Sequence, residues 1–165
     1  MKNDVKKNLP GLRIYKTVFA VFLCLLIDLL RGVSTVHSSF AAIVCLKGNF
    51  NASWDAGKKR FVGTFLSGIM SYIFLKLFQI GLGLNPKSFI YIVLLLAWML
   101  LLMSILKFIG FAESISIAGI VMLIICITDV NMRPLSYAAN RVIDTSIGIM
   151  IAVIVNWLPF LNKKK

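Results

Sequence analysis

The sequence predicts an all-α integral membrane protein with six transmembrane helices. Of its 165 residues, 59% are hydrophobic and the mean hydropathy is +0.91, which exceeds what the surface of a globular protein tolerates. The apolar residues form six runs with short breaks between them. The net charge of +12 comes from basic residues that cluster between these runs. Such clusters act as topology signals, whereas a nucleic-acid-binding surface would line a polar face.

The six runs have lengths typical of membrane-spanning helices. A helix needs about 20 residues to cross about 30 Å of hydrocarbon. Helices satisfy their backbone hydrogen bonds within one segment, which favours a bundle over a barrel with strands of alternating polarity. The polar stretch 47–60 is expected to be a loop. The runs extend over about residues 14–30, 33–46, 61–78, 89–106, 115–130 and 142–161.

The basic residues also predict the orientation in the membrane. With the N-terminus inside, 13 of the 18 Lys and Arg fall on the cytoplasmic side and five on the other. This bias places both termini in the cytoplasm and requires an even number of spans. The first run has no small-residue cleavage site after it, so we expect it to remain as a helix. Asp28 and Arg31 lie at its end, where their charges can reach water.

The two halves of the chain resemble each other. AAIVCL at 41–46 resembles AGIVML at 118–123, and RFVGTFLSG at 60–68 resembles RVIDTSIG at 141–148. We therefore predict one domain over residues 1–165 that contains two repeats, at about 12–80 and about 86–161. Because each repeat has three helices, the second enters the membrane in the opposite sense. Inverted repeats of this kind enclose the substrate path of many transporters. Short helices at equivalent places in the two repeats indicate where that path lies.

Charged and hydroxylated residues open the matching third and sixth runs. Arg60 and Thr64 begin the third, and Arg141, Asp144 and Thr145 begin the sixth. A charge within the bilayer costs about 2.5–3.5 kcal/mol, so such residues should face the bundle interior or water. Guanidinium groups bind carboxylates bidentately, and we predict that these five residues line an anion path. The alternatives are a topology anchor at Arg60 and a structural ion pair of Arg141 with Asp144, which are three residues apart.

Small residues follow on the same two runs. Gly63, Ser67 and Gly68 occur in the third run, and Gly148 and Ala152 in the sixth, on faces where small residues recur every fourth position. Such faces let helix backbones approach closely, and we assign these five residues to helix packing.

Enzyme and metal chemistry find little support in the sequence. His37, the only histidine, begins the second run, where it is a candidate proton relay or an interfacial polar residue. Cys24, Cys45 and Cys126 stand singly inside apolar runs, without the spacing of a metal site. A phosphate-binding glycine loop, an H-E-x-x-H motif and a catalytic triad are all absent. We therefore expect no enzyme activity, no metal and no other cofactor.

The matching segments resemble a known family. Arg-x-x-Gly-Thr-x-x-x-Gly at 60–68 and Arg-x-x-Asp-Thr-x-x-Gly at 141–148 resemble the aromatic acid exporter and fusaric acid resistance superfamily of bacterial membrane proteins, over nearly the whole chain. The resemblance implies a multi-pass protein of the bacterial inner membrane that exports aromatic or other organic acid anions. It also implies a distant fold relationship to plant malate channels, which are dimers, so we expect a homodimer in the lipid bilayer and no nucleic acid partner. The alternatives are an anion channel and a non-transporting scaffold or assembly subunit.

Overall fold

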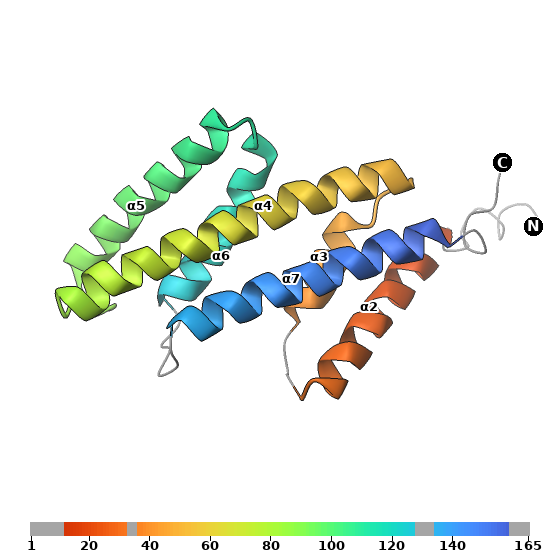
Figure 1. Cartoon of the computed structure of the whole chain (residues 1–165), viewed down its shortest axis with the longest axis horizontal. Helices are drawn as coiled ribbons and strands as arrows, with labels where there is room; N and C mark the ends of the chain where they lie inside the picture. The colour runs from red at the N-terminus through yellow and green to blue at the C-terminus, as the bar shows by residue number, and fades with distance from the viewer. Residues whose placement is uncertain (1–11, 33–35, 128–133, 159–165) are drawn as a thin grey trace, which may run out of the picture. The chain divides into compact units, whose positions relative to one another are not determined.

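The computed structural model describes residues 12–32, 36–127 and 134–158, and all regular structure in these ranges is helical (Figure 1). The all-α fold class is therefore confirmed. The ends of the runs predicted at 33–46, 115–130 and 142–161 lie partly outside the described residues. The elements are α2 (Leu12–Leu30), α3 (His37–Cys45), α4 (Phe50–Phe74), the π-helix η1 (Leu75–Gly81), α5 (Phe89–Phe108), the 3₁₀ helix η2 (Ala112–Ser114), α6 (Ile115–Ile127) and α7 (Pro134–Trp157).

Three helices in the described part of the chain are long and apolar enough to cross a membrane. They are α4 continued by η1, with 32 residues, α5 with 20, and the 20 residues of α7 from Ala138 onward. The 19-residue α2 contains Arg13, Lys16 and Asp28, and α3 has only nine residues. These features identify a membrane protein, and the count of six spans stays a prediction.

Helix α4 begins ten residues before Arg60, so the prediction of a loop over 47–60 is wrong. The backbone N–H of Ala52 donates to Asn49 Oδ1 at 2.9 Å, which caps the first turn as N-terminal asparagines commonly do. Lysine and arginine are good helix formers, so the polar residues after the cap continue the helix. In α7 the first residue is Pro134, a position that proline favours because its missing N–H would have no partner there. Arg60 and Arg141 therefore lie inside their helices and not at the start.

The chain divides into two compact units, and the division falls inside α4 and α7. Unit 1 contains the described residues up to Gly57 and from Ser146 onward, and unit 2 extends from Lys58 to Thr145. Each unit thus combines helices from both halves of the sequence. The predicted single domain and its repeats at 12–80 and 86–161 stay a prediction.

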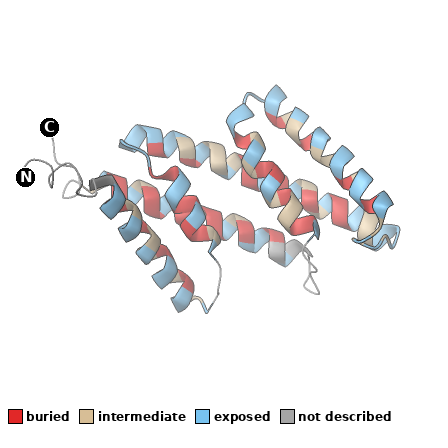
Figure 2. Cartoon of the chain, turned by 180° about the vertical axis from the view of Figure 1, so that it is seen from behind, coloured by how far each residue is buried: buried red, intermediate tan, exposed pale blue. Residues whose placement is uncertain are grey.

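Unit 1 is held together by small residues. Buried residues recur along its helices (Figure 2), and its core includes Ala20 of α2, Ala42 of α3 and Ala152 of α7. A Cβ added to Gly148 of α7 would collide with the Ser38 carbonyl oxygen at the start of α3. Glycine at this position therefore allows the two helices to pack at backbone distance.

Unit 2 has a larger, aromatic core. The rings of Phe74 and Tyr91 meet edge to face with centroids 5.3 Å apart, a favoured arrangement of aromatic pairs. Tyr91 Oη donates to the Cys126 carbonyl oxygen at 2.7 Å, near the end of α6. Trp98 Nε1 donates to the Met70 carbonyl oxygen at 3.1 Å, one turn before α4 changes to the π-helix. Each polar aromatic group thus binds a carbonyl group near a helix end or transition.

Candidate functional site

All five residues of the predicted anion path belong to unit 2. Thr64 of α4 is 1% exposed, and Arg141, Asp144 and Thr145 of α7 are 8%, 1% and 5% exposed. Arg60 is half-buried. A buried guanidinium and a buried carboxylate three residues apart are expensive in an apolar bundle, so they require polar surroundings or a polar ligand.

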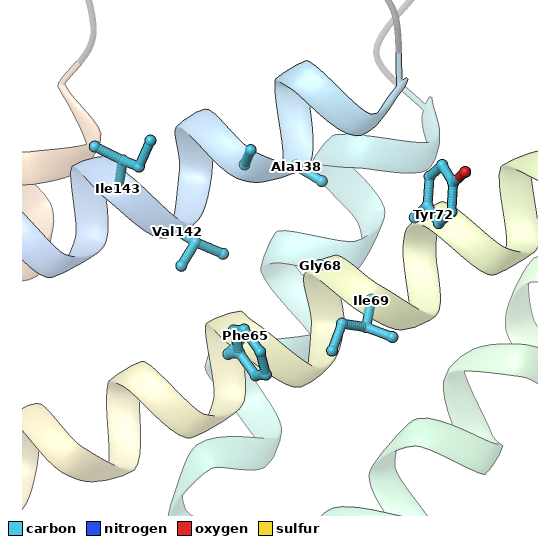
Figure 3. Close-up of a pocket in the computed structure, with 8 residues that line it drawn as sticks. Phe65, Gly68, Ile69, Tyr72, Ala138, Val142 and Ile143 are labelled. Atoms are coloured by element: carbon cyan, nitrogen blue, oxygen red, sulfur yellow. The ribbon is translucent and has the colours of Figure 1, made fainter.

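Within unit 2, α4 and α7 run antiparallel (Figure 3). Phe65 lies on the same side as Val142, whereas Tyr72 lies towards Ala138 (Figure 3). A Cβ added to Gly68 would lie 3.6 Å from Val142 Cγ2 and 4.0 Å from Ala138 Cβ. Gly68 therefore marks the level at which the two helices approach each other.

This register sets which polar residues share a level along the two helices. At about 1.5 Å of rise per residue, Thr64 falls at the level of Asp144, and Ser67 at the level of Arg141. Arg60 lies one turn before Thr64. Along the helix axes, Asp144 therefore lies between the levels of the two arginines.

An apolar groove of about 350 Å³ lies between the same two helix segments (Figure 3). Phe65, Ile69 and Ile143 on its walls are partly exposed, whereas Thr64 and Asp144 are buried. Hydrocarbon suits such a lining, but a carboxylate does not. The groove is lined by Phe65, Gly68, Ile69, Tyr72, Ala138, Ala139, Val142 and Ile143.

The five residues assigned to packing are all buried. Gly63, Ser67 and Gly68 belong to unit 2, and Gly148 and Ala152 to unit 1. A Cβ added to Gly63 would lie 3.0 Å from the Cβ and the carbonyl oxygen of a serine at the start of α6.

The candidate proton relay lies elsewhere. His37 is the first residue of α3, is half-buried, and belongs to unit 1. Across residues 12–32, 36–127 and 134–158, there is no group of three or more His, Cys, Asp or Glu side chains that could hold a metal ion.

Sequence reasoning missed a buried polar network in unit 1. Lys16 is only 6% exposed, and its Nζ donates to Asn156 Oδ1 at 3.3 Å. Asn156 Nδ2 donates to the Lys47 carbonyl oxygen at 3.0 Å and to Ser53 Oγ at 2.9 Å. The network joins α2, the loop after α3, α4 and α7. The sequence signal for this network is a lysine inside an apolar run. Because Lys16 also counts among the basic residues that predict the membrane topology, its burial was not predicted.

A second buried polar group in unit 1 is Asp28. Its side chain is almost fully buried, and Ser38 Oγ donates to Asp28 Oδ2 at 2.5 Å. Arg31 Nη1 lies 3.8 Å from Asp28 Oδ1. The expectation that the Asp28 charge reaches water at the end of α2 is therefore wrong, because α3 covers the carboxylate and supplies a hydroxyl donor.

Comparison with known proteins identifies the family of the chain. A family model described as fusaric acid resistance protein-like matches residues 19–155, which include every predicted path residue. No curated protein and no solved structure matches the chain. The matched region covers most of the chain and confirms the resemblance found in the sequence. The chain therefore belongs to the fusaric acid resistance protein-like family and is a membrane transport-related protein.

Proposed function

We propose that this protein exports aromatic or other organic acid anions across the bacterial inner membrane and carries out no covalent chemistry. The observation that carries the proposal is Arg141, a guanidinium that is 8% exposed inside unit 2. Arginine keeps its charge at every physiological pH and binds carboxylates through two parallel hydrogen bonds. An ionisable side chain at such a place in a membrane protein commonly marks a substrate path.

The surroundings of Arg141 support an anion that binds and then leaves. Asp144 lies one turn further along α7 and is buried. Its negative charge weakens the attraction of the path for anions, which permits release of the cargo. Arg60 extends the positive field by one turn beyond Thr64 on α4.

We further propose that six spans form two inverted repeats with both termini in the cytoplasm. The short α3, with nine residues, and α6, with 13, occupy equivalent places in these repeats. Short helices at equivalent places accompany the substrate site in inverted-repeat transporters. Reporter tags at each terminus, tested for protection in sealed right-side-out vesicles, check this topology. Digestion of either tag from outside would refute it.

The test of transport uses purified protein in proteoliposomes. Uptake or efflux is measured for aromatic and aliphatic carboxylates at two proton gradients. Arg141→Gln should abolish flux with unchanged insertion, and Lys107→Gln, at the exposed end of α5, serves as a matched loss of positive charge. Undiminished flux in Arg141→Gln would remove this residue from the mechanism.

Two other functions fit the same helices. An anion channel has the same lining, and its flux would follow the electrical potential at both proton gradients. A non-transporting scaffold or assembly subunit would use Arg141 and Asp144 only for packing. Exchange of the two residues, Arg141→Asp with Asp144→Arg, keeps the pair and reverses its direction. If function survives in this double variant, the pair of Arg141 and Asp144 is structural.

We propose that the protein works as a homodimer in the lipid bilayer. Helices α3 and α6 are short, with nine and 13 residues, and the apolar groove of about 350 Å³ on unit 2 can receive side chains from a second chain. The relevant measurements are the mass of the protein in detergent and in nanodiscs, and the flux into vesicles that contain one chain each. A fully active monomer would refute the homodimer.

A further inference from the structure

Three hydroxyl groups on α4 are buried without a hydrogen bond. Thr64 is 1% exposed, Ser67 and Ser71 are 0% exposed, and none of the three side-chain oxygens has a partner within the described part of the chain. Ser71 lies beside the Cys126 thiol, but thiols are weak hydrogen-bonding groups and the geometry does not reach that of a bond. We name these three side chains the α4 hydroxyl track.

The α4 hydroxyl track follows one face of the helix. Spacings of three and four residues align side chains on an α-helix, and the seven steps from Thr64 to Ser71 extend over about 10 Å. Gly63 and Gly68 accompany the track on the same helix. The first approaches Ser114, the last residue of η2 directly before α6, at 3.0 Å, and the second approaches Val142 of α7 at 3.6 Å, both measured from an added Cβ. The track therefore faces the interior of unit 2 between α6 and α7.

Helix packing alone does not account for these hydroxyls. A buried hydroxyl without a partner destabilises the fold, and alanine would allow the same close approach without that cost. Two other serines of unit 2 do have partners. Ser104 Oγ donates to the Leu100 carbonyl oxygen of its own helix at 2.8 Å. Ser114 Oγ donates to the Lys59 carbonyl oxygen at 2.6 Å. Within the described part of unit 2, the buried hydroxyls without a partner all lie on this face of α4, whereas Ser39 of α3 in unit 1 is a further such hydroxyl. A bound ligand would supply the partner that the α4 hydroxyls lack.

We propose that the α4 hydroxyl track binds a file of water molecules, along which the carboxylate of the cargo moves to and from Arg141. A hydroxyl both donates and accepts, as water does, and a buried water needs two to four polar partners. Ser67 falls at the level of Arg141 and Thr64 at that of Asp144, so the file passes both buried charges and continues one turn further to Ser71. The role in cargo movement rests on the proposed transport function, whereas the presence of water does not.

The first test is the thermal stability of Ser67→Ala and Ser71→Ala in detergent. If the hydroxyls bind water, removing them leaves the melting temperature unchanged or lowers it. If they are dry and unpartnered, each substitution removes a buried polar group and raises the melting temperature by about 2–10 °C. Ser104→Ala is the control, because that hydroxyl already has a partner. A rise in both track variants would overturn the proposal.

The second test is thiol labelling in proteoliposomes, with the three native cysteines replaced by alanine. Ser67→Cys and Ser71→Cys should react with a small water-soluble methanethiosulfonate at least about tenfold faster than Leu66→Cys, because the thiolate forms only where water reaches it. Leu66 packs against the core of unit 2 on the same helix. Equal rates at the three positions would contradict a hydrated track.

The two proposals fail in different ways. If the unsubstituted protein moves no carboxylate, the transport function fails, and the labelling rates still decide whether water enters the track. If flux is present but the Ser67→Cys rate equals the Leu66→Cys rate, the track alone fails. With both present, Ser67→Ala should slow carboxylate flux about tenfold, which corresponds to one strong hydrogen bond lost along the route.

Discussion

Two buried glycines should respond in opposite directions to the same substitution. Gly148 in α7 and Gly68 in α4 both lie in helix interiors, where alanine is more stable than glycine by about 0.5–1 kcal/mol. At Gly68 the added Cβ meets Val142 Cγ2 at 3.6 Å, an ordinary van der Waals distance. We expect Gly68→Ala to raise the free energy of unfolding by about 0.5–1 kcal/mol.

At Gly148 the packing opposes this gain. The added Cβ would collide with the Ser38 carbonyl oxygen and lie 2.6 Å from Ala41 Cβ, whereas carbon atoms in contact are about 3.5–4.0 Å apart. Helix α3 would have to move by about 1 Å, and forcing extra atoms into a packed core costs about 1–3 kcal/mol or more. We expect Gly148→Ala to lower the free energy of unfolding by about 1–2 kcal/mol net.

The measurement is equilibrium unfolding of both variants and the unsubstituted protein in the same detergent. SDS is added in increasing amounts as the denaturant, and the loss of helicity is the signal. The opposite signs make each variant the control for the other, because expression, detergent and helix propensity affect both alike. A Gly148→Ala variant as stable as Gly68→Ala would refute the close approach of α7 to α3 in unit 1.

The same unfolding assay checks three further side chains. Asn156→Ala should lower stability by about 1–3 kcal/mol, because its amide satisfies several buried partners. Ser38→Ala should lower it by about 1.5–3 kcal/mol, because the Asp28 carboxylate loses a charge-assisted bond of 2.5 Å; an unchanged value would mean that water replaces the hydroxyl. Glu113→Gln should change it by less than about 1 kcal/mol, since the 2.7 Å ion pair with Lys59 is largely exposed, and a larger loss would show that this pair is structural.

Hydropathy predicted the helices that begin at a sharp change in polarity. Helix α5 starts at Phe89 as expected, because a proline, a lysine and a serine at 86–88 precede a run that is apolar up to Ser104. The start of α4 was missed because its first turns are polar, and the hydropathy of a polar helical turn equals that of a loop. Asn49 was the sequence signal that could have placed it, since its side chain caps the helix.

Spacing within one helix predicted shared faces but not partners. The stripe through Asp144, Gly148 and Ala152 is buried along α7, as the spacing of four residues indicates. The same stripe crosses from unit 2 into unit 1, which no periodicity reveals. The bond between Lys16 and Asn156 joins residues 140 positions apart, and only the packing of α2 against α7 brings them together.

The contrast between Gly63 and Asp144 shows what the two long helices contribute separately. These residues hold equivalent positions in the predicted repeat, yet the first lies so close to Ser114 of unit 2 that even a Cβ would be tight at 3.0 Å. A carboxylate at position 63 would therefore separate α4 from the start of α6. At position 144 the carboxylate is accommodated and buried, at a level between those of Arg60 and Arg141. At these equivalent positions α4 provides close packing and α7 provides a negative charge, which in the proposed transport path would oppose the positive field of the two arginines.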